Sequence, residues 1–182
     1  MARLSRANIP NFLTFSRVAC VPIALLLILV LSAPQAALLA LFVYAAATDF
    51  LDGYLARRWQ VTSKLGTMLD PLADKLLVAL LLIYLVSHTE MPTLPVMLIL
   101  LREIYISGLR EFLGNQQIEL PVSSGGKWKT AMQMLAITLL LAAPVFQFPA
   151  FMPMGSFVLM MAAALAVISA VSYTKQSIRY FV

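Results

Sequence analysis

The chain has 182 residues, of which 62% are hydrophobic and only 12% are charged, and its net charge is +5. Soluble globular domains are about 45–50% apolar and about 25% charged, so this composition excludes an ordinary soluble domain and favours a protein that lies in a lipid bilayer. No basic tract with interleaved aromatic residues supports nucleic-acid binding, so no nucleic-acid partner is expected.

Six apolar stretches approach or exceed the roughly 17–25 residues that a helix needs to cross the hydrocarbon core. In chain order they are predicted at about Phe12–Ser32, Gln35–Arg57, Thr67–Val86, Pro92–Phe112, Lys127–Val145 and Phe151–Ser172. Residues Met1–Pro10 are predicted to form a basic amphipathic juxtamembrane segment on the membrane surface. Because the spans take up nearly the whole chain, we expect one all-α integral membrane domain, residues 1–182, with six transmembrane helices.

The 13 Lys and Arg residues are distributed unevenly about these spans. They lie in the terminal segments, in the 58–66 and 113–126 loops, or in the helix halves that approach them. The opposite turns, 32–35, 87–92 and 143–153, contain no Lys or Arg. By the positive-inside rule, both termini of this multi-pass protein are expected in the cytoplasm. The net positive charge is therefore attributed to topology and to contact with anionic lipid.

Half of the eight acidic residues lie within one short stretch, DFLDGYLARRWQVTSKLGTMLDPLADK. Asp49 and Asp52 are three residues apart near the end of the second predicted helix, so they share a face. Asp70 and Asp74 are four apart at the start of the third, where Pro71 is compatible with a first helical turn. Because the connecting loop is short, the two helices are expected to be antiparallel neighbours on which the four carboxylates converge.

Four carboxylates that meet at the membrane boundary would repel one another and lose hydration, so positive charge is expected between them. Divalent cations with oxygen ligands fit best, and Mg²⁺ prefers a few carboxylates together with substrate phosphate oxygens. Two such ions can hold the attacking and the leaving oxygen of a phosphoryl-type displacement. The alternative is a solvated loop in which the aspartates pair with Arg57, Arg58, Lys64 and Lys75. That alternative leaves the shared helix faces and the adjacent small residues unexplained.

The same stretch resembles the signature of the CDP-alcohol phosphatidyltransferase family at every fixed position: Asp49-x₂-Asp52-Gly53-x₂-Ala56-Arg57-x₈-Gly66-x₃-Asp70-x₃-Asp74. The resemblance implies six helices, a homodimer, and a bacterial inner-membrane enzyme whose active site faces the cytoplasm. It implies that two Mg²⁺ or Mn²⁺ ions are bound by Asp49, Asp52, Asp70 and Asp74. It also implies that Asp74 is the general base, and that the site for CDP and its diphosphate is shaped by Gly53, Ala56, Arg57 and Gly66.

The signature leaves the acceptor alcohol open among inositol, inositol phosphate, serine, choline and glycerol 3-phosphate. Three further segments bear on the choice: NIPNFLTFSR (8–17), LREIYISGLREF (101–112) and SSGGKWKTAMQM (123–134). All three resemble the bacterial members of the family that use glycerol 3-phosphate. The resemblance thus implies that CDP-diacylglycerol and sn-glycerol 3-phosphate are the substrates, and that phosphatidylglycerophosphate and CMP are the products.

Two cations are candidate ligands for the phosphate of such an acceptor. Glu103, Ser107 and Arg110 follow i, i+4, i+7 spacing within an apolar span, where charged residues usually face a polar cavity. The segment Ser123–Lys127 places small residues, backbone amides and a cation at a helix start, which suits a phosphate. Arg110 and Lys127 are therefore predicted to bind the acceptor phosphate. The alternative is interfacial snorkelling and Arg–Glu pairing, which suits Lys129 better than Arg110.

Two other classes of membrane protein use intramembrane carboxylates. Aspartate-rich prenyltransferases also hold a diphosphate through Mg²⁺, but they differ in the spacing of the glycine and arginine and normally have more helices. A divalent-cation carrier or channel would need a polar path to the opposite face, where His88 and Glu90 are the only charge-capable residues.

Overall fold

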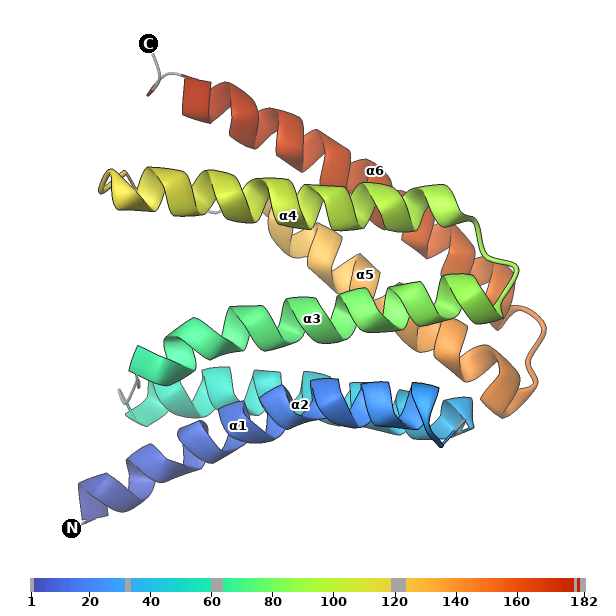
Figure 1. Cartoon of the computed structure of the whole chain (residues 1–182), viewed down its shortest axis with the longest axis horizontal. Coiled ribbons are helices and arrows are strands. Elements are labelled where there is room, and N and C mark those ends of the chain that lie inside the picture. The colour runs from blue at the N-terminus through green and yellow to red at the C-terminus, as the bar shows by residue number, and fades with distance from the viewer. Residues whose placement is uncertain (1, 32–33, 60–63, 119–123, 179, 181–182) are drawn as a thin grey trace. The chain divides into compact units, whose positions relative to one another are not determined.

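A computed structural model describes all residues of the chain except 1, 32–33, 60–63, 119–123, 179 and 181–182. For residues 2–11, 55–57, 64–68, 70 and 124–127 it describes the backbone only. In the part of the chain that it describes, all regular secondary structure is α-helical (Figure 1). The predicted all-α class is thereby confirmed.

The helices are α1 (Ala2–Leu29), α2 (Gln35–Trp59), α3 (Lys64–His88), α4 (Thr93–Asn115), α5 (Ser124–Phe146) and α6 (Phe151–Ile178). Every predicted span coincides with one of them, with ends that differ by a few residues. The exception is the start of α1, which begins at Ala2 rather than Phe12, so the predicted juxtamembrane segment continues the first helix. Its amphipathic character rests on side chains outside the described part of the chain.

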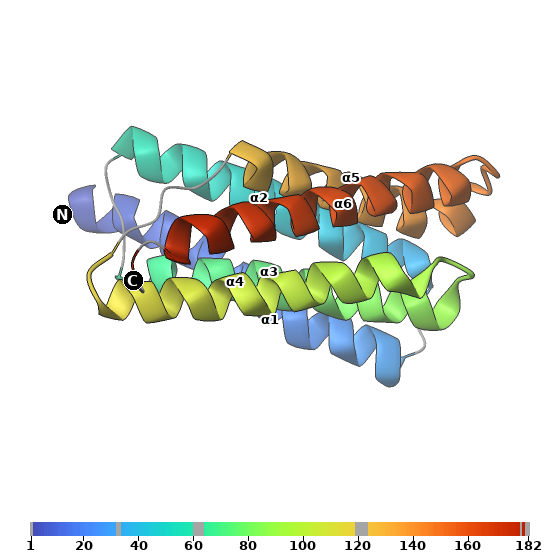
Figure 2. The ribbon, with the colours of Figure 1, turned by 90° about the horizontal axis from the view of Figure 1, so that it is seen from above.

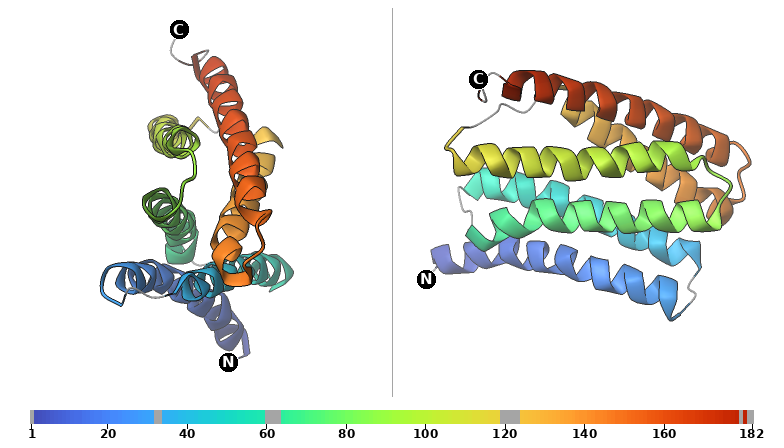
Figure 3. Two further views of the ribbon diagram at one scale, coloured as in Figure 1. Left: turned by 90° about the vertical axis from the view of Figure 1, so that its right-hand side faces the viewer. Right: turned by 45° about the horizontal axis from the view of Figure 1, so that its top comes forward.

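The chain forms two compact units, residues 1–84 and 85–182. The first contains α1, α2 and most of α3, and the second contains α4, α5 and α6. Within each unit, consecutive helices run in opposite directions (Figure 3). The expectation of one membrane domain over residues 1–182 stays a prediction.

In the first unit, α1 packs against α2. The buried face of α1 contains Arg17, Cys20 and Ala24, which follow i, i+3, i+7 spacing, and α2 buries Phe42 and Ala45. In a bilayer there is little hydrophobic force between helices, so their association relies on close packing, which small residues such as Ala24 and Ala45 permit. Arg17 is the charged residue on this packed face of α1.

In the second unit, α5 and α6 form a helical hairpin (Figure 2), and α6 also packs against α4. The buried face of α6 is built largely of small residues such as Gly155, Ala162 and Ala166. A Cβ atom at Gly155 would lie 2.7 Å from Cγ and 3.2 Å from the backbone nitrogen of Leu140 on α5. Glycine is needed here because the two helices approach too closely for a side chain.

Five of the described helices are long and apolar enough to cross a membrane, which confirms a multi-pass membrane protein. The sixth, α4, has 23 residues, but its apolar sequence is interrupted by Arg102, Glu103, Arg110 and Glu111. The helices also expose many large apolar side chains, as expected for a surface in hydrocarbon. That α4 also spans the membrane stays a prediction.

The prediction for Pro71 was wrong. The proline lies inside α3, which begins at Lys64, and not in the first turn of that helix. It has no N–H to donate to the carbonyl of Thr67, and its ring crowds the same carbonyl. The prediction took the proline as the mark of a helix start, whereas residues 64–70 add about two turns before it.

We expect Gly155→Ala to lower the stability of the protein by roughly 1 kcal/mol. Overpacking costs about 1–3 kcal/mol, and the better helix propensity of alanine recovers about 1 kcal/mol of that loss. The measurement is thermal unfolding of the purified protein in detergent.

The matched control is Gly108→Ala in α4, where no heavy atom lies within 4 Å of an added Cβ. This variant should be at least as stable as the wild type. Equal effects of the two substitutions would contradict the close α5–α6 approach.

Candidate active site

Three of the four predicted aspartates have described side chains, and all three converge on one arginine. The guanidinium of Arg17 on α1 lies 2.9 Å from Oδ1 of Asp49 and 3.6 Å from Oδ2 of Asp52, both on α2. Its Nε lies 3.7 Å from Oδ1 of Asp74 on α3. We call these four residues the aspartate–arginine cluster. Residues far apart in the sequence are thus brought together by three helices of the first unit.

The cluster has a buried side and an exposed side. Arg17 is fully buried, whereas the side chains of Asp49 and Asp74 are 56% and 45% exposed. Asp52 is buried, and its Oδ2 accepts a hydrogen bond from Oγ1 of Thr14 at 3.3 Å. Thr14 and Arg17 are three residues apart on α1 and therefore face the same side. The carboxylate of Asp52 is thus held by Thr14 on the buried side, and those of Asp49 and Asp74 are accessible to solutes.

The remaining signature residues are only partly described. Gly53 lies on α2 and is partly exposed. The side chains of Ala56, Arg57 and Asp70, and the surroundings of Gly66, lie outside the described part of the chain. The backbone of α3 does place Asp70 about one turn before the last aspartate of the signature, as its spacing indicates. The predicted roles of these residues stay predictions.

No role was predicted from the sequence for Arg17 or Thr14, whose segment, residues 8–17, bore only on the choice of acceptor. A signal was present, because a charged residue inside an apolar span usually faces the protein interior and has a function. The partners of Arg17 could not be predicted from the sequence, since they depend on which helices pack together.

The chemistry of the cluster suits hard divalent cations. Three carboxylates with described side chains lie close to one guanidinium, and carboxylate oxygens are the ligands that Mg²⁺ and Mn²⁺ prefer. In the arrangement observed, however, no three Asp, Glu, His or Cys side chains of the described residues are grouped closely enough to hold an ion. The guanidinium of Arg17 lies where the carboxylates meet. The donor type fits a divalent ion, and the carboxylates would have to rearrange around it.

A second group of charges lies in the unit formed by residues 85–182. Nζ of Lys129 on α5 contacts Oε1 of Glu103 on α4, and Nη1 of Arg102 lies 3.0 Å from the same oxygen. Arg102 also donates hydrogen bonds of 3.1 and 3.2 Å to Oγ of Ser169 on α6. We call these four residues the Glu103–Lys129 cluster. Lys129 is buried, so interfacial snorkelling is the wrong interpretation for it, whereas the expected Arg–Glu pairing is present.

The two predicted ligands of the acceptor phosphate lie in the same unit. Nη2 of Arg110 donates a hydrogen bond of 2.6 Å to the hydroxyl of buried Tyr173, and its guanidinium carbon lies 5.1 Å from the centre of the tyrosine ring. Arg110 is exposed, and its contacts with the buried side chain of Tyr173 fix its orientation. Lys127 belongs to the first turn of α5, and its side chain lies outside the described part. Ser107 donates a hydrogen bond to the backbone carbonyl of Glu103 at 2.6 Å.

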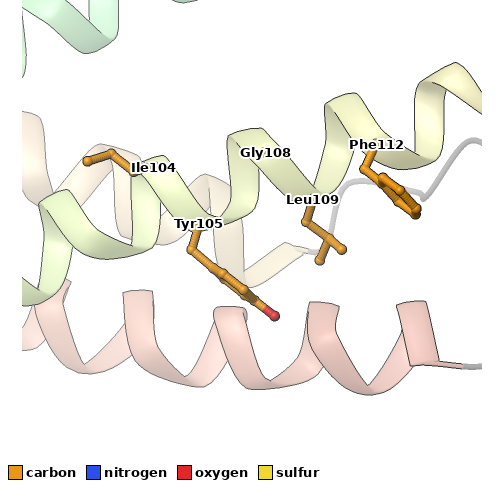
Figure 4. Close-up of a pocket in the computed structure, with 5 residues that line it drawn as sticks. All are labelled: Ile104, Tyr105, Gly108, Leu109 and Phe112. Carbon is orange, nitrogen blue, oxygen red and sulfur yellow. The ribbon is translucent and has the colours of Figure 1, made fainter. Parts of the chain in front are cut away.

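One face of α4 carries an open apolar groove of about 420 Å³ (Figure 4), which is lined by Ile104, Tyr105, Gly108, Leu109 and Phe112. Gly108 leaves space in the middle of this lining, since no heavy atom lies within 4 Å of an added Cβ. The hydroxyl of Tyr105 is hydrogen-bonded to Oγ1 of Thr174 on α6 at 2.9 Å. Because none of the described residues that line the groove is charged, it is not a candidate for phosphoryl chemistry.

Comparison with known protein families decides between the classes that these clusters allow. The family model described as CDP-alcohol phosphatidyltransferase matches residues 7–171, which include the whole signature and Arg17. The chain belongs to the CDP-alcohol phosphatidyltransferase family. The prenyltransferase and cation-carrier alternatives are therefore set aside, and the aspartate–arginine cluster is the candidate active site of a family member.

Curated relatives share one name, CDP-diacylglycerol–glycerol-3-phosphate 3-phosphatidyltransferase. The relative from Rickettsia bellii is 40% identical over 177 residues, covering 96% of this chain and 97% of its own. The relative from Haemophilus influenzae is 39% identical over 167 residues, or 88% of each chain. One from Arabidopsis thaliana, whose name carries the suffix 2, is 39% identical over 184 residues, covering 93% of this chain and 79% of its own.

The Glu103–Lys129 cluster of this family member can be tested by its stability. Glu103→Gln should lower the free energy of unfolding by about 3 kcal/mol or more, because it leaves two cations without their shared carboxylate. Lys129→Met should have a smaller effect, since Arg102 still neutralises Glu103. The double variant should be more stable than the sum of the single losses predicts. Thermal unfolding in detergent measures all three.

Glu111→Gln, at an exposed position on the same helix, is the matched control and should change stability little. If Glu103→Gln and Glu111→Gln had equal effects, the buried ion pair would not contribute to the fold.

Proposed function

We propose that this enzyme transfers the phosphatidyl group of CDP-diacylglycerol to sn-glycerol 3-phosphate, which yields phosphatidylglycerophosphate and CMP in phospholipid biosynthesis. The observation that carries the proposal is the similarity, 40% identity over 96% of the chain, to an enzyme named for this reaction. The lipid substrate agrees with the five apolar helices. A nucleotide-activated donor agrees with the family to which the chain belongs.

Asp74 is the proposed general base. Its carboxylate accepts the proton of the glycerol 1-hydroxyl, and the oxygen forms a bond to the phosphorus that carries diacylglycerol. The bond from that phosphorus to the CMP oxygen breaks, and CMP leaves. The half-exposed carboxylate of Asp74 is accessible to a substrate hydroxyl, and its contact with Arg17 limits its orientation. Direct displacement is proposed because the cluster offers carboxylates and a guanidinium, and no activated nucleophile.

We propose that two Mg²⁺ or Mn²⁺ ions are bound by the four signature aspartates, Asp49, Asp52, Asp70 and Asp74. When bound, such ions neutralise the carboxylates and the diphosphate of the donor and favour charge transfer to the leaving group. Support comes from the approach of three carboxylates to one another in the cluster and from the exposure of two of them. Thr14 holds the third carboxylate in place.

The nucleotide site is proposed around the four remaining signature residues, Gly53, Ala56, Arg57 and Gly66. The glycine and alanine follow the buried aspartate of α2 with almost no side chain, which leaves room for a bulky ligand. A guanidinium such as that of Arg57 suits a diphosphate, because it donates two parallel hydrogen bonds.

Arg110 and Lys127 are proposed to bind the phosphate of the acceptor. Arg110 is exposed and is oriented by Tyr173, so little conformational freedom would be lost when it binds an anion. Lys127 lies in the first turn of α5 beside two glycines, where backbone N–H groups point away from the helix and attract anions. Cations beyond those needed for the nucleotide favour an acceptor that is itself charged.

We further propose that the enzyme lies in the bacterial inner membrane with six spans and that its termini and active site face the cytoplasm. Support comes from the three predicted outer turns, which contain no Lys or Arg. A homodimer is proposed from the family resemblance alone.

The choice of acceptor is tested with purified protein and labelled CDP-diacylglycerol. Glycerol 3-phosphate should release CMP and form phosphatidylglycerophosphate, while inositol and serine should react at least about 100-fold more slowly. The reason is that the cations of a site built for a phosphate are left unpaired by inositol and are only partly paired by the single carboxylate of serine. Faster turnover with inositol or serine would keep the family chemistry and refute the acceptor.

The role of Asp74 is tested by Asp74→Asn, which should reduce turnover by about 10²–10⁴-fold through loss of the general base. The control is Glu90→Gln, an exposed residue after α3, which should retain the activity of the wild type. Both rates are measured as CMP release under identical conditions. Comparable losses in the two variants would show that the active site is not at the signature.

A further inference from the structure

Arg17 is fully buried and contacts three carboxylates, yet the proposed reaction gives it no chemical role. We propose that Arg17 is an internal counter-cation, which holds the three carboxylates together in the absence of divalent ions and lowers the affinity of the site for those ions. The inference rests on the proposed metal site. It makes Arg17 a positioning residue whose charge competes with the metal.

The geometry matches this role because each nitrogen of the guanidinium lies within ion-pair distance of a different carboxylate, and Nη1 is also within hydrogen-bond distance of its own. Nη1 lies closest to Asp49, at 2.9 Å, Nη2 lies 3.6 Å from Asp52, and Nε lies 3.7 Å from Asp74. The guanidinium carries its donors on three nitrogens in fixed directions, so one side chain can lie close to carboxylates on two helices at once. The compact ammonium of a lysine would pair with fewer of them.

The burial of Arg17 supports the same role. A guanidinium with no exposed surface has given up its hydration, which is favourable only if opposite charges surround it. Arg17 also stabilises the charged carboxylates, because three negative groups that lie close together would otherwise repel one another. Arg17 and the aspartates therefore stabilise the packing of α1 against α2 in a mutually dependent way, and the contact with Asp74 links α1 to α3.

A divalent ion has to share these carboxylates with Arg17. Mg²⁺ requires carboxylate oxygens at about 2.0–2.1 Å, and the guanidinium lies where the three described carboxylates meet. The positive charge of Arg17 repels the ion, and this repulsion is strong because the ion carries two positive charges. Loss of Arg17 also removes the preorganisation of the carboxylates, but a divalent ion gathers them by its own attraction. The repulsion term is therefore expected to dominate.

The test uses the full-length protein in detergent, with Mn²⁺ as the probe and no lipid substrate present. Free Mn²⁺ is measured by electron paramagnetic resonance, and thermal unfolding is recorded in EDTA and in saturating Mn²⁺. Arg17→Gln should bind Mn²⁺ at least tenfold more tightly than the wild type. Its melting temperature should fall by several degrees in EDTA and should be largely restored by Mn²⁺.

Arg17→Lys keeps the charge without the three-way contact, and it provides a milder variant if Arg17→Gln does not fold. In EDTA its melting temperature should fall less than that of Arg17→Gln. Its affinity for Mn²⁺ should lie between those of the wild type and Arg17→Gln. Arg58→Gln is the matched control, because Arg58 is an exposed arginine on α2 that contacts Tyr54. It should leave both measurements unchanged.

Weaker or unchanged Mn²⁺ binding in the Arg17 variants would overturn the inference, as would equal losses of melting temperature with and without Mn²⁺. The second result would make Arg17 a purely structural residue. The variant Asp49→Asn distinguishes a failure of the proposed role of Arg17 from a failure of the proposed metal site. If Asp49→Asn leaves Mn²⁺ binding intact, the proposed metal ligands are wrong and the inference falls with them.

Discussion

The structure of the candidate site depends on the neutralisation of buried charge in a protein that is otherwise apolar. Arg17 has no exposed surface, so its charge is stable only because Asp49, Asp52 and Asp74 approach it from α2 and α3. The carboxylates depend on the arginine in the same way, since charges are costly to bury unless they are paired. This mutual dependence joins three helices of the first unit and sets the positions of the groups proposed for catalysis.

The second unit uses the same principle in a different arrangement. Lys129 and Arg102 share the carboxylate of Glu103, and Arg102 reaches Ser169 on α6. These polar contacts are possible because the helices are close together, and they are close because small residues such as Gly155 line α6. Two of the four charges that interrupt the apolar sequence of α4, Arg102 and Glu103, are thus accommodated between the helices of this unit.

The chemistry of the family explains why an apolar chain keeps such expensive groups. The proposed reaction joins a lipid that stays in the membrane to a charged alcohol that comes from water. The protein therefore needs apolar outer surfaces together with carboxylates and cations near the membrane boundary. In the first unit a buried cation, Arg17, is provided by the chain itself and neutralises part of the charge of the carboxylates that it contacts.

Much of this was accessible from the sequence. Hydropathy predicted the six helices, and the spacing of Asp49 and Asp52 predicted that these two carboxylates share a face of α2, because span length and helical period are local properties. The start of α3 ahead of Pro71 and the role of Arg17 were missed. Local spacing cannot tell which distant helix supplies a counter-charge, and the same holds for the pairing of Lys129 with Glu103. Those partners are decided by tertiary packing, in which close helix approach and the avoidance of unpaired buried charge select one arrangement among many.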